Sequence, residues 1–391
     1  MIRREDGTGT IYKRNDKIVM RKRYGTKPDG SPLYKYFTGD TEAEVKKQAR
    51  QYELKREVVT DDAIAKMPFG EYFKMWMSKY KKRQVKDSTY EAIDYCYSCR
   101  IQPYDICMTQ MKNLNTDTLQ DYFNELVDNN QYARATVKKT YDTINNCLKK
   151  GRVIGHLIKN PMDGVSIPTE EHFEKKTKNI EFFEENDFNK IIKEAKRKYF
   201  NGTRVYQYGD DVLLLLYTGI RIGEGLALKW ENVDIENKKM HIKTTISRIK
   251  SEDGSRFNKE TSTKTKKSNR CVYLTSQAIE CLNNLKKRNS PLINSSDYLF
   301  LSEKGKLTCG KNVRRCLNAI QRNAHTAVQN SGLHTLRHTF ATTLIRKGVD
   351  IKIISELLGH TKVSTTYDCY IHVIEEQKHQ AFNTIENAFS S

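Results

Sequence analysis

The stretch LHTLRHTFATTLIRKG, residues 333–348, predicts an amphipathic helix with polar chemistry on a second face. Its apolar residues recur at helical spacing, namely Leu336, Phe340, Leu344 and Ile345. His334 and Arg337 lie three residues apart on another face, so both side chains can approach one phosphate group. We interpret His338 as a residue that packs against or supports its neighbours. Spacing alone does not separate this arrangement from an ordinary helix.

An arginine earlier in the chain follows a predicted helix end. Residues 210–217 are apolar enough for a buried helix, and Gly219 is typical of the position just after a helix. Arg221 comes next, in TGIRIGE, and Glu224 lies three residues later on the same helical face, where it can brace the guanidinium group. An ordinary surface Arg–Glu pair is the alternative.

The segment after residue 350 supplies another histidine and two tyrosines. Gly359 is predicted to end a helix, which places His360 at the helix exit, and residues 364–366 begin the segment that carries Tyr370. A free phenol has a pKa near 10, so attack on phosphorus at neutral pH needs a base or a strongly stabilised phosphate. Tyr367 competes with Tyr370, and these residues alone leave that choice open.

Composition indicates a partner with many negative charges. The chain has 391 residues with 68 Lys and Arg against 48 Asp and Glu, a formal charge of +20 and a pI near 9.4. The length predicts two or three domains, and the basic residues extend from Arg3 to Lys378. This spread favours a long polyanion over a local contact, although a merely soluble basic protein is the alternative.

Neither a membrane nor a metal is indicated. The first 20 residues contain no apolar core of a secretory signal, and the longest apolar run, 212–217, is too short to span a bilayer, so we expect a cytoplasmic protein. Nine cysteines in such a protein predict reduced thiols. Cys96 and Cys99 form a CxxC pair without further ligands at zinc spacing, so we interpret both as helix residues.

The first predicted domain, residues 1–66, combines three short strands and a helix. Alternating stretches between residues 9 and 37 are separated by Asn15-Asp16 and by Pro28-Asp29-Gly30, and a helical pattern follows at 42–57. Basic residues alternate with four tyrosines, Tyr12, Tyr24, Tyr34 and Tyr36. This composition is compatible with a small DNA-reading sheet, and a basic sheet that is only solvated is the alternative.

The second predicted domain, residues 67–168, is helical. Its aromatic residues recur at helical spacing, and we interpret them as core. Five basic residues gather around a helix end and loop, where they can grip a phosphate backbone: Lys79, Lys81, Lys82, Arg83 and Lys86. A solvated charged face is the alternative.

A charged linker is predicted at 169–180, followed by a mostly helical domain at 181–391 with one small antiparallel sheet. The strands of that sheet are expected at 241–249 and 269–274, joined by a basic stretch at 250–267. The fold class is therefore multidomain α+β.

The ordered motifs resemble those of the tyrosine recombinase, or phage integrase, family, and in particular the three-domain integrases of conjugative transposons and temperate phages. TGIRIGE is similar to the family's first arginine box, HTLRHTFAT to its His-x-x-Arg box, and LLGHTKVSTTYDCYIHV to its Leu-Gly-His and tyrosine box. That register implies Tyr370 as the nucleophile and His372 as a trailing histidine, with Tyr367 as a neighbour. The family's hairpin lysine matches Lys264 best, within TSTKTKKSNRCVYL.

The resemblance implies a role for each matched residue. Tyr370 would attack the scissile phosphate to form a 3′-phosphotyrosine link and free a 5′-hydroxyl, and Arg221 and Arg337 would stabilise the charge on the phosphate oxygens. His334 and His360 would bind the phosphate or handle the tyrosine proton, and Lys264 would protonate the leaving oxygen. No metal, ATP or other cofactor is implied.

The resemblance also implies partners: double-stranded DNA with arm-type sites for the first domain and core-type sites for the others, a homotetramer on DNA, and helper proteins that bend DNA or promote excision. A C-terminal stripe is predicted to dock on a neighbouring subunit or on its own domain; it consists of Ile374, Phe382, Ile385 and Phe389. Two alternatives of a different class are a type IB topoisomerase and a DNA-binding regulator without catalysis.

Overall fold

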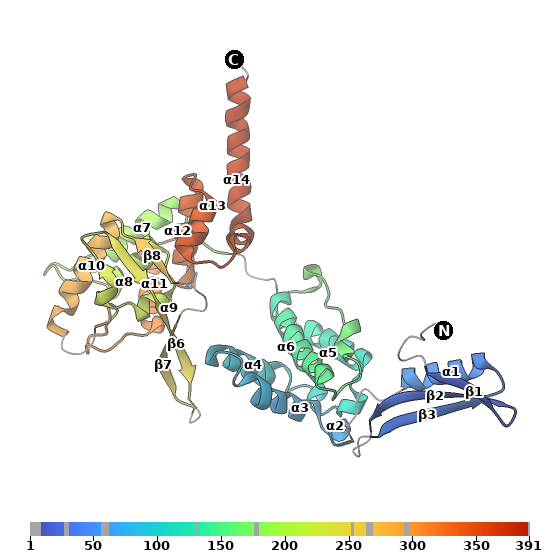
Figure 1. The fold of residues 1–391 in the computed structure, drawn as a ribbon. Coiled ribbons are helices and arrows are strands. Elements are labelled where there is room, and N and C mark those ends of the chain that lie inside the picture. Colours follow the sequence, from blue (N-terminus) through green and yellow to red (C-terminus); the bar gives the residue numbers. More distant parts are fainter. Residues whose placement is uncertain are drawn as a thin grey trace. The chain divides into compact units, whose positions relative to one another are not determined.

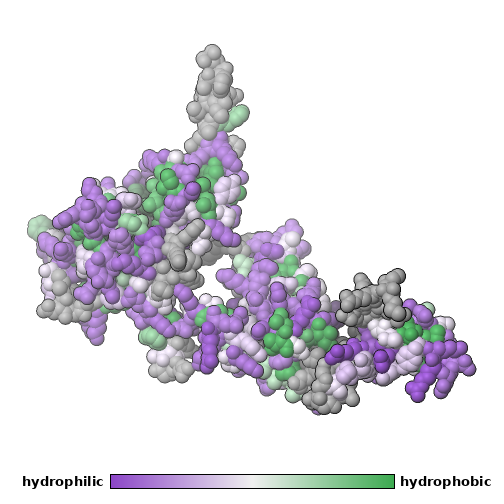
Figure 2. Space-filling view, in the orientation of Figure 1, coloured by the Kyte–Doolittle hydropathy of each residue, from purple (hydrophilic) through white to green (hydrophobic). Residues whose placement is uncertain are grey.

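The computed structural model describes residues 9–26, 31–55, 62–129, 131–175, 180–251, 254–262, 269–292 and 297–389. Internal contacts divide the chain into two compact units, Met1–Thr177 and Lys178–Ser391. Their helices and strands are labelled in Figure 1. Among the described helices, none combines the length and the apolar character that a membrane span requires. Hydrophilic residues dominate the described surface in the view of Figure 2.

The first unit begins with the predicted three-stranded sheet and helix. The strands are antiparallel in the order β1 (Thr10–Arg14), β2 (Lys17–Thr26) and β3 (Pro32–Gly39). Asn15 and Asp16 join the first two strands with φ angles of 46° and 57°, as in the tight turns that match strand twist. Helix α1 (Glu42–Lys55) lies against the sheet (Figure 1). It buries Val45 and Ala49 in a small core with residues of the sheet.

The tyrosines of this sheet are exposed. Alternation along β3 places Tyr34 and Tyr36 on the face opposite the buried Phe37. The guanidinium group of Arg21 lies 4.7 Å from the ring centre of Tyr34. The sheet therefore presents a surface of aromatic and basic side chains. The side chain of Tyr24 and the predicted turn Pro28-Asp29-Gly30 lie outside the described residues.

The rest of the first unit is helical, as predicted. Its α-helices are α2 (Asp62–Lys66), α3 (Phe69–Trp76), α4 (Asp87–Arg100), α5 (Thr116–Asp128) and α6 (Arg134–Val153). Short helical turns are η1 (Met77–Lys81), η2 (Asp105–Cys107), η3 (Met111–Asn113), η4 (Pro161–Gly164) and η5 (Glu170–His172). The interpretation of the aromatic stripes as core is confirmed, since Phe69, Phe73 and Trp76 are buried together. Cys96 is a buried residue of α4.

The basic cluster follows an irregular helix end. Helix α3 continues into the π-helical turn η1, and a loop then leads to α4. Lys79, Lys82, Arg83 and Lys86 are exposed there, whereas Lys81 lies with its ammonium nitrogen 5.2 Å from the ring centre of Trp76. These side chains are thus presented to solvent from one short segment.

Part of the predicted linker belongs to the first unit. Phe173 is only 1% exposed and packs in the helical core, and the Nζ of Lys175 donates to the carbonyl of Gln131 at 3.1 Å. The prediction missed this because one apolar residue among charged neighbours produces no periodic pattern. Residues 176–179 lie outside the described part of the chain.

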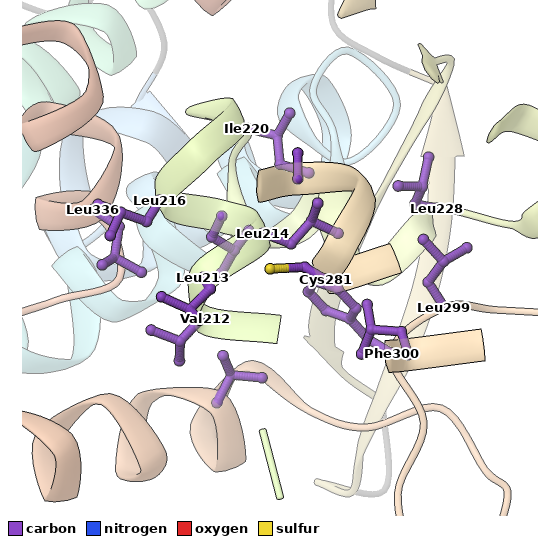
Figure 3. Packing of buried hydrophobic residues seen from close by; sticks show 14 of the residues in the cluster. Val212, Leu213, Leu214, Leu216, Ile220, Leu228, Cys281, Leu299, Phe300 and Leu336 are labelled. Atoms are coloured by element: carbon purple, nitrogen blue, oxygen red, sulfur yellow. The ribbon is translucent and has the colours of Figure 1, made fainter. Parts of the chain in front are cut away.

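The second unit is built around the buried helix α8 (Gly209–Thr218). Val212, Leu213, Leu214 and Leu216 pack against apolar residues from several elements, including Cys281 and Leu336 (Figure 3). The other helices are α7 (Glu185–Ala195), α9 (Ile222–Ala227), α10 (Ser276–Asn289), α11 (Gly310–Asn323), α12 (His334–Arg346), α13 (Ile351–Leu358) and α14 (Val363–Phe389), with short turns η6 (Trp230–Asn232) and η8 (Ser290–Leu292).

The sheet of this unit differs from the prediction. Strands β4 (Val233–Asp234), β5 (Lys239–Ile242) and β8 (Arg270–Tyr273) form one antiparallel sheet, and β6 (Thr244–Lys250) pairs with β7 (Arg256–Ser262) in a separate hairpin. The single strand predicted at 241–249 is therefore two strands, and the predicted basic connection contains β7. Sequence periodicity missed β7 because RFNKETS has one apolar residue, Phe257, and so shows no apolar alternation.

The end of α8 generates a testable prediction. Gly219 has a φ of +62°, and a Cβ added there would lie 2.4 Å from the ring of Phe340. Gly348 also has a positive φ, +77°, but no atom lies within 4 Å of an added Cβ. Gly348→Ala should therefore lower the free energy of unfolding by about 1 kcal/mol. Gly219→Ala should lower it by about 1–3 kcal/mol more, because it also overpacks the core.

Denaturant unfolding of the full chain, followed by circular dichroism, measures both changes. Equal losses in the two variants would show that Phe340 yields to the new methyl group and that the close approach at Gly219 is not needed.

Candidate active site

The end of helix α13 gathers three arginines. Gly359 adopts the left-handed conformation, with a φ of +67°, and ends the helix. The last carbonyl groups of a helix have no partner within it and carry partial negative charge. Two of them accept hydrogen bonds from guanidinium groups: Leu357 from Arg270 at 2.7 Å, and Leu358 from Arg337 at 2.6 Å and from Arg221 at 3.4 Å. Arginines from α12, β8 and the start of α9 thus meet at one point.

Glu224 holds two of these arginines from the other side. Its carboxylate is 3% exposed and lies 2.9 Å from both the Arg221 and the Arg270 guanidinium groups. It also accepts from the backbone N–H of Arg221 at 2.9 Å, which completes the cap of α9. Burial alone would raise the pKa of Glu224, but the hydrogen bonds and charge of Arg270, together with Arg221, outweigh burial and lower it. The predicted brace is confirmed.

Arg270 is a site residue that the sequence reasoning missed. It begins β8, and strand alternation places it on the same side as Val272, a core residue. Its side chain is only 6% exposed. A cation on the inward side of a strand needs a buried partner, so the position of Arg270 in the strand could have predicted a buried ion pair.

Arg337 is held from two elements. Its side chain donates to the carbonyls of Gly219 at 2.8 Å and of Leu358, and the residue is 4% exposed. Burial first, and then the neighbouring Arg221 charge, lower the pKa of Arg337 to about 9, so the group still carries its charge at neutral pH. The contacts described for Arg337 leave its other N–H groups without a partner, so these groups can bind a ligand.

The histidines of the site are neutral at pH 7. Burial and the charges of Arg337, Arg221 and Arg270 lower the pKa of His360 to about 4, and its Nδ1 lies 2.7 Å from the Oγ1 of Thr366. His334 is exposed, yet the surrounding protein removes enough water to lower its pKa, and the charges of Arg337 and Arg221 act in that direction. Both rings can accept or donate one hydrogen bond.

Tyr370 lies at a break in helix α14. Its φ and ψ of −121° and 20° are not helical, and its side chain is 1% exposed. Burial raises the pKa of the phenol although Arg337 opposes that shift. Its Oη lies 2.8 Å from the Nδ1 of His338, so the residue interpreted as packing also contacts the phenol. Tyr367, one turn earlier, is 37% exposed.

Two residues named by the motifs lack a described side chain. Lys264 falls in the segment 263–268, outside the described residues, between β7 and β8. His372 lies in α14, but its side chain is also outside the description. The other motif residues, Arg221, His334, Arg337, His360 and Tyr370, influence one another's charge or share partners.

This arrangement has a defined chemical capacity. Paired guanidinium groups suit the oxygens of an anion such as phosphate, and the fixed charges can stabilise further negative charge during a reaction. Neutral histidines can transfer protons, and a phenol can act as a covalent nucleophile. The fold and the site together define a protein that can transfer a phosphoryl group to a tyrosine.

Comparison with known protein families agrees with that chemistry. The phage integrase family matches residues 181–377, and the N-terminal SAM-like domain of phage integrases matches residues 68–127. The chain belongs to the phage integrase family, whose members are tyrosine recombinases.

Similar proteins cover most of the chain. A XerC-like tyrosine recombinase of Caldanaerobacter subterraneus subsp. tengcongensis is 30% identical, with 97% of this chain and 99% of the relative covered. The integrase of Staphylococcus phage L54a is 26% identical over 71% of this chain and 80% of its own.

Solved structures share the fold. The integrase of transposon Tn1549, in complex with transposon right end DNA, has a TM-score of 0.67 at 15% identity, covering 83% of this chain and 100% of its own. A lambda integrase dimer bound to a core site has a TM-score of 0.57 at 14% identity, covering 94% and 96%. The predicted multidomain α+β fold is confirmed.

The role of Glu224 generates a prediction about stability and pH. Glu224→Gln should lower the free energy of unfolding by about 3–5 kcal/mol at pH 7, because it leaves the buried Arg270 and the partly exposed Arg221 without their countercharge. Since the pKa of Glu224 is lowered in the folded protein, its contribution is present above the unfolded pKa of about 4.3 and is lost as pH falls below it. The deficit of the variant should therefore shrink in acid.

Glu184→Gln is the matched control, because Glu184 pairs with Arg346 on the surface, at 61% exposure. It should change the free energy of unfolding by less than about 1 kcal/mol. Denaturant unfolding at a series of pH values between pH 3 and pH 8 measures the free energy of unfolding of both variants. A constant deficit of Glu224→Gln across this range would contradict an ionised, paired Glu224.

Proposed function

We propose that this chain is a site-specific recombinase that cuts and rejoins DNA through a 3′-phosphotyrosine bond at Tyr370, and thereby integrates and excises a mobile genetic element. One observation carries the proposal. Arg221 and Arg337, far apart in sequence, donate to the same carbonyl of Leu358. The phenol of Tyr370 is hydrogen-bonded to His338, the residue directly after Arg337. This arrangement supports the assignment of the two arginines as the cations that hold a phosphate and of Tyr370 as the nucleophile that attacks it.

Each site residue then has a role. Arg221 and Arg337 bind the non-bridging oxygens of the scissile phosphate and stabilise the charge that builds on them. His334 and His360 hydrogen-bond that phosphate. Lys264 protonates the leaving 5′-oxygen, and the freed hydroxyl of a partner strand later reverses the attack. Fixed cations do the work of charge stabilisation, and the phosphotyrosine retains the bond energy, so we propose that neither a metal ion nor ATP is required.

The rest of the chain binds DNA in this proposal. Residues 1–66 form an arm-type binding domain with the exposed tyrosines and basic residues of the first sheet, and residues 67–168 form a core-binding domain with the Lys79–Lys86 cluster. Residues 181–391 form the catalytic domain. The formal charge of +20 supports such a long contact, as do the Tn1549 and lambda integrases solved in complex with DNA.

Assembly follows from the same proposal. Lambda integrase has been solved as a tetramer on a Holliday junction, at a TM-score of 0.54 and 14% identity to this chain. We propose a tetramer of this chain on DNA in which α14 docks on a neighbouring subunit; the exposed Phe382, at 62%, is available for that contact. Helper proteins that bend DNA complete the assembly, in the cytoplasm of a bacterium.

Replacing the nucleophile tests the proposal. Tyr370→Phe should retain DNA affinity and lose covalent protein–DNA adducts entirely, because only the attacking oxygen is removed. Tyr367→Phe, the matched control one helical turn away, should form adducts at the wild-type rate. Denaturing gel electrophoresis of each protein with a nicked duplex from the junctions of its own element measures the adduct.

Other results point to other functions. An adduct that persists in Tyr370→Phe and disappears in Tyr367→Phe would overturn the assignment of the nucleophile. Relaxation of supercoiled DNA without strand exchange between duplexes would identify a topoisomerase, and DNA binding without any adduct would identify a regulator.

The domain division generates a further prediction. Ile64 and Ala65 of α2 are buried in the core of the helical domain, so a fragment that begins at Asp62 keeps that core complete. The fragment 62–391 should protect the core site and fail to protect a second, arm-type sequence that the full chain protects. Footprinting of both proteins on one long duplex is the measurement. Identical footprints would show that residues 1–61 do not read DNA.

A further inference from the structure

We propose that His338 is a catalytic residue that takes the phenolic proton of Tyr370 when this oxygen attacks phosphorus and returns it when the phosphotyrosine bond breaks. The inference rests on the proposed function and goes beyond it, because it assigns the proton acceptor to a residue outside the six matched by the motifs. His338 is the residue directly after Arg337 on α12.

The geometry is that of a nucleophile and its base. The Nδ1 of His338 lies 2.8 Å from the Oη of Tyr370, and the two rings meet edge to face with centres 5.8 Å apart. A general base must lie within hydrogen-bond reach of the proton that it removes. Among the described contacts of Tyr370, this is the hydrogen bond made by the phenol.

The neighbouring residues fix α12 in this position. Arg337 is bonded to Gly219 and Leu358, and Thr339, on the other side of His338, is fully buried. The Oγ1 of Thr339 donates to the carbonyl of Thr335 at 2.8 Å and accepts from the N–H of Phe183 at 2.9 Å. Since Arg337 is held by Gly219 and Leu358, and Thr339 by Phe183, the direction of His338 between them is also set. The contact with Tyr370 is therefore built into the fold.

Charge around His338 suits a base that acts only with substrate. Burial lowers the pKa of His338 to about 4, and His334 and Arg337 on α12 act in the same direction. The ring is thus neutral, and one of its nitrogens is an acceptor. The groups on other elements that act on His338 are His360 after α13 and Tyr370 on α14. A bound phosphate would offset the cations and raise the pKa of His338 toward the working range.

The two other histidines are placed differently. The Nδ1 of His360 is engaged by Thr366 at 2.7 Å, and His334 is exposed at the first turn of α12. In the proposed function both of these bind the phosphate, whereas His338 is half-buried and contacts the phenol.

The proposed step balances. In cleavage, a bond forms between Tyr370 Oη and phosphorus, the bond from phosphorus to the 5′-oxygen breaks, the phenolic proton moves to His338 Nδ1, and Lys264 supplies a proton to the 5′-oxygen. In rejoining, a 5′-hydroxyl attacks phosphorus and returns a proton to Lys264. The bond to Tyr370 then breaks, and its phenolate regains the proton from His338. No oxidant, reductant or further reactant is needed.

Single-turnover cleavage of a nicked duplex by the full chain tests this role. In His338→Asn the amide oxygen can occupy the place of Nδ1 and accept the hydrogen bond, but it cannot take a proton. We expect unchanged melting temperature and DNA affinity, adduct formation slower by about 100-fold to 10,000-fold, and loss of the acidic limb of the pH–rate profile. His338→Ala should show the same defect, with partial rescue by added imidazole.

A second substrate separates the base from the acid. When sulfur replaces the bridging 5′-oxygen, the leaving group departs without a proton, so a Lys264→Ala variant should recover and His338→Asn should not. Recovery of His338→Asn on this substrate, or a wild-type rate and pH profile on the ordinary duplex, would overturn the proposal. Faster adduct formation would show instead that His338 restrains the phenol. If wild type forms no adduct, the proposed function fails and this role fails with it.

Discussion

Three guanidinium groups lie together in the second unit because one carboxylate and one helix end neutralise them. Like charges at such short range repel strongly, more so where water is scarce. Glu224 offsets Arg221 and Arg270, and the carbonyls at the end of α13 offset the same two arginines and Arg337. The left-handed Gly359 that ends α13 leaves these carbonyls open to the arginines, so the site depends on where that helix stops.

Burial and the same charges together determine the protonation of the residues around them. The loss of water, and then the arginines, lower the pKa values of His334, His338 and His360, which keeps the imidazoles neutral and able to accept protons. Burial raises the pKa of Tyr370, so the phenol keeps its proton at neutral pH. An anion that enters this site offsets the charge of the arginines and raises the pKa of the neighbouring imidazoles, which makes them better bases.

Local signals made much of this predictable from sequence. The end of α8 at Gly219, the brace between Arg221 and Glu224, the shared face of His334 and Arg337, and the end of α13 at Gly359 each depend on a few neighbouring residues. Contacts between distant segments were not predictable in this way: Arg270 with Glu224, Phe173 in the core of the first unit, and His338 with Tyr370. Strand β7 was missed because its polar residues show no apolar alternation.

The central claim is that the oxygen of Tyr370 attacks DNA, and the most direct measurement identifies the residue that carries the DNA. The wild-type adduct on a nicked duplex can be digested with nuclease and trypsin and analysed by tandem mass spectrometry. Cleavage after Lys362 and Lys378 yields one peptide with both Tyr367 and Tyr370. We predict a nucleotide remnant on Tyr370, and a remnant on Tyr367 or on any other residue would contradict the account.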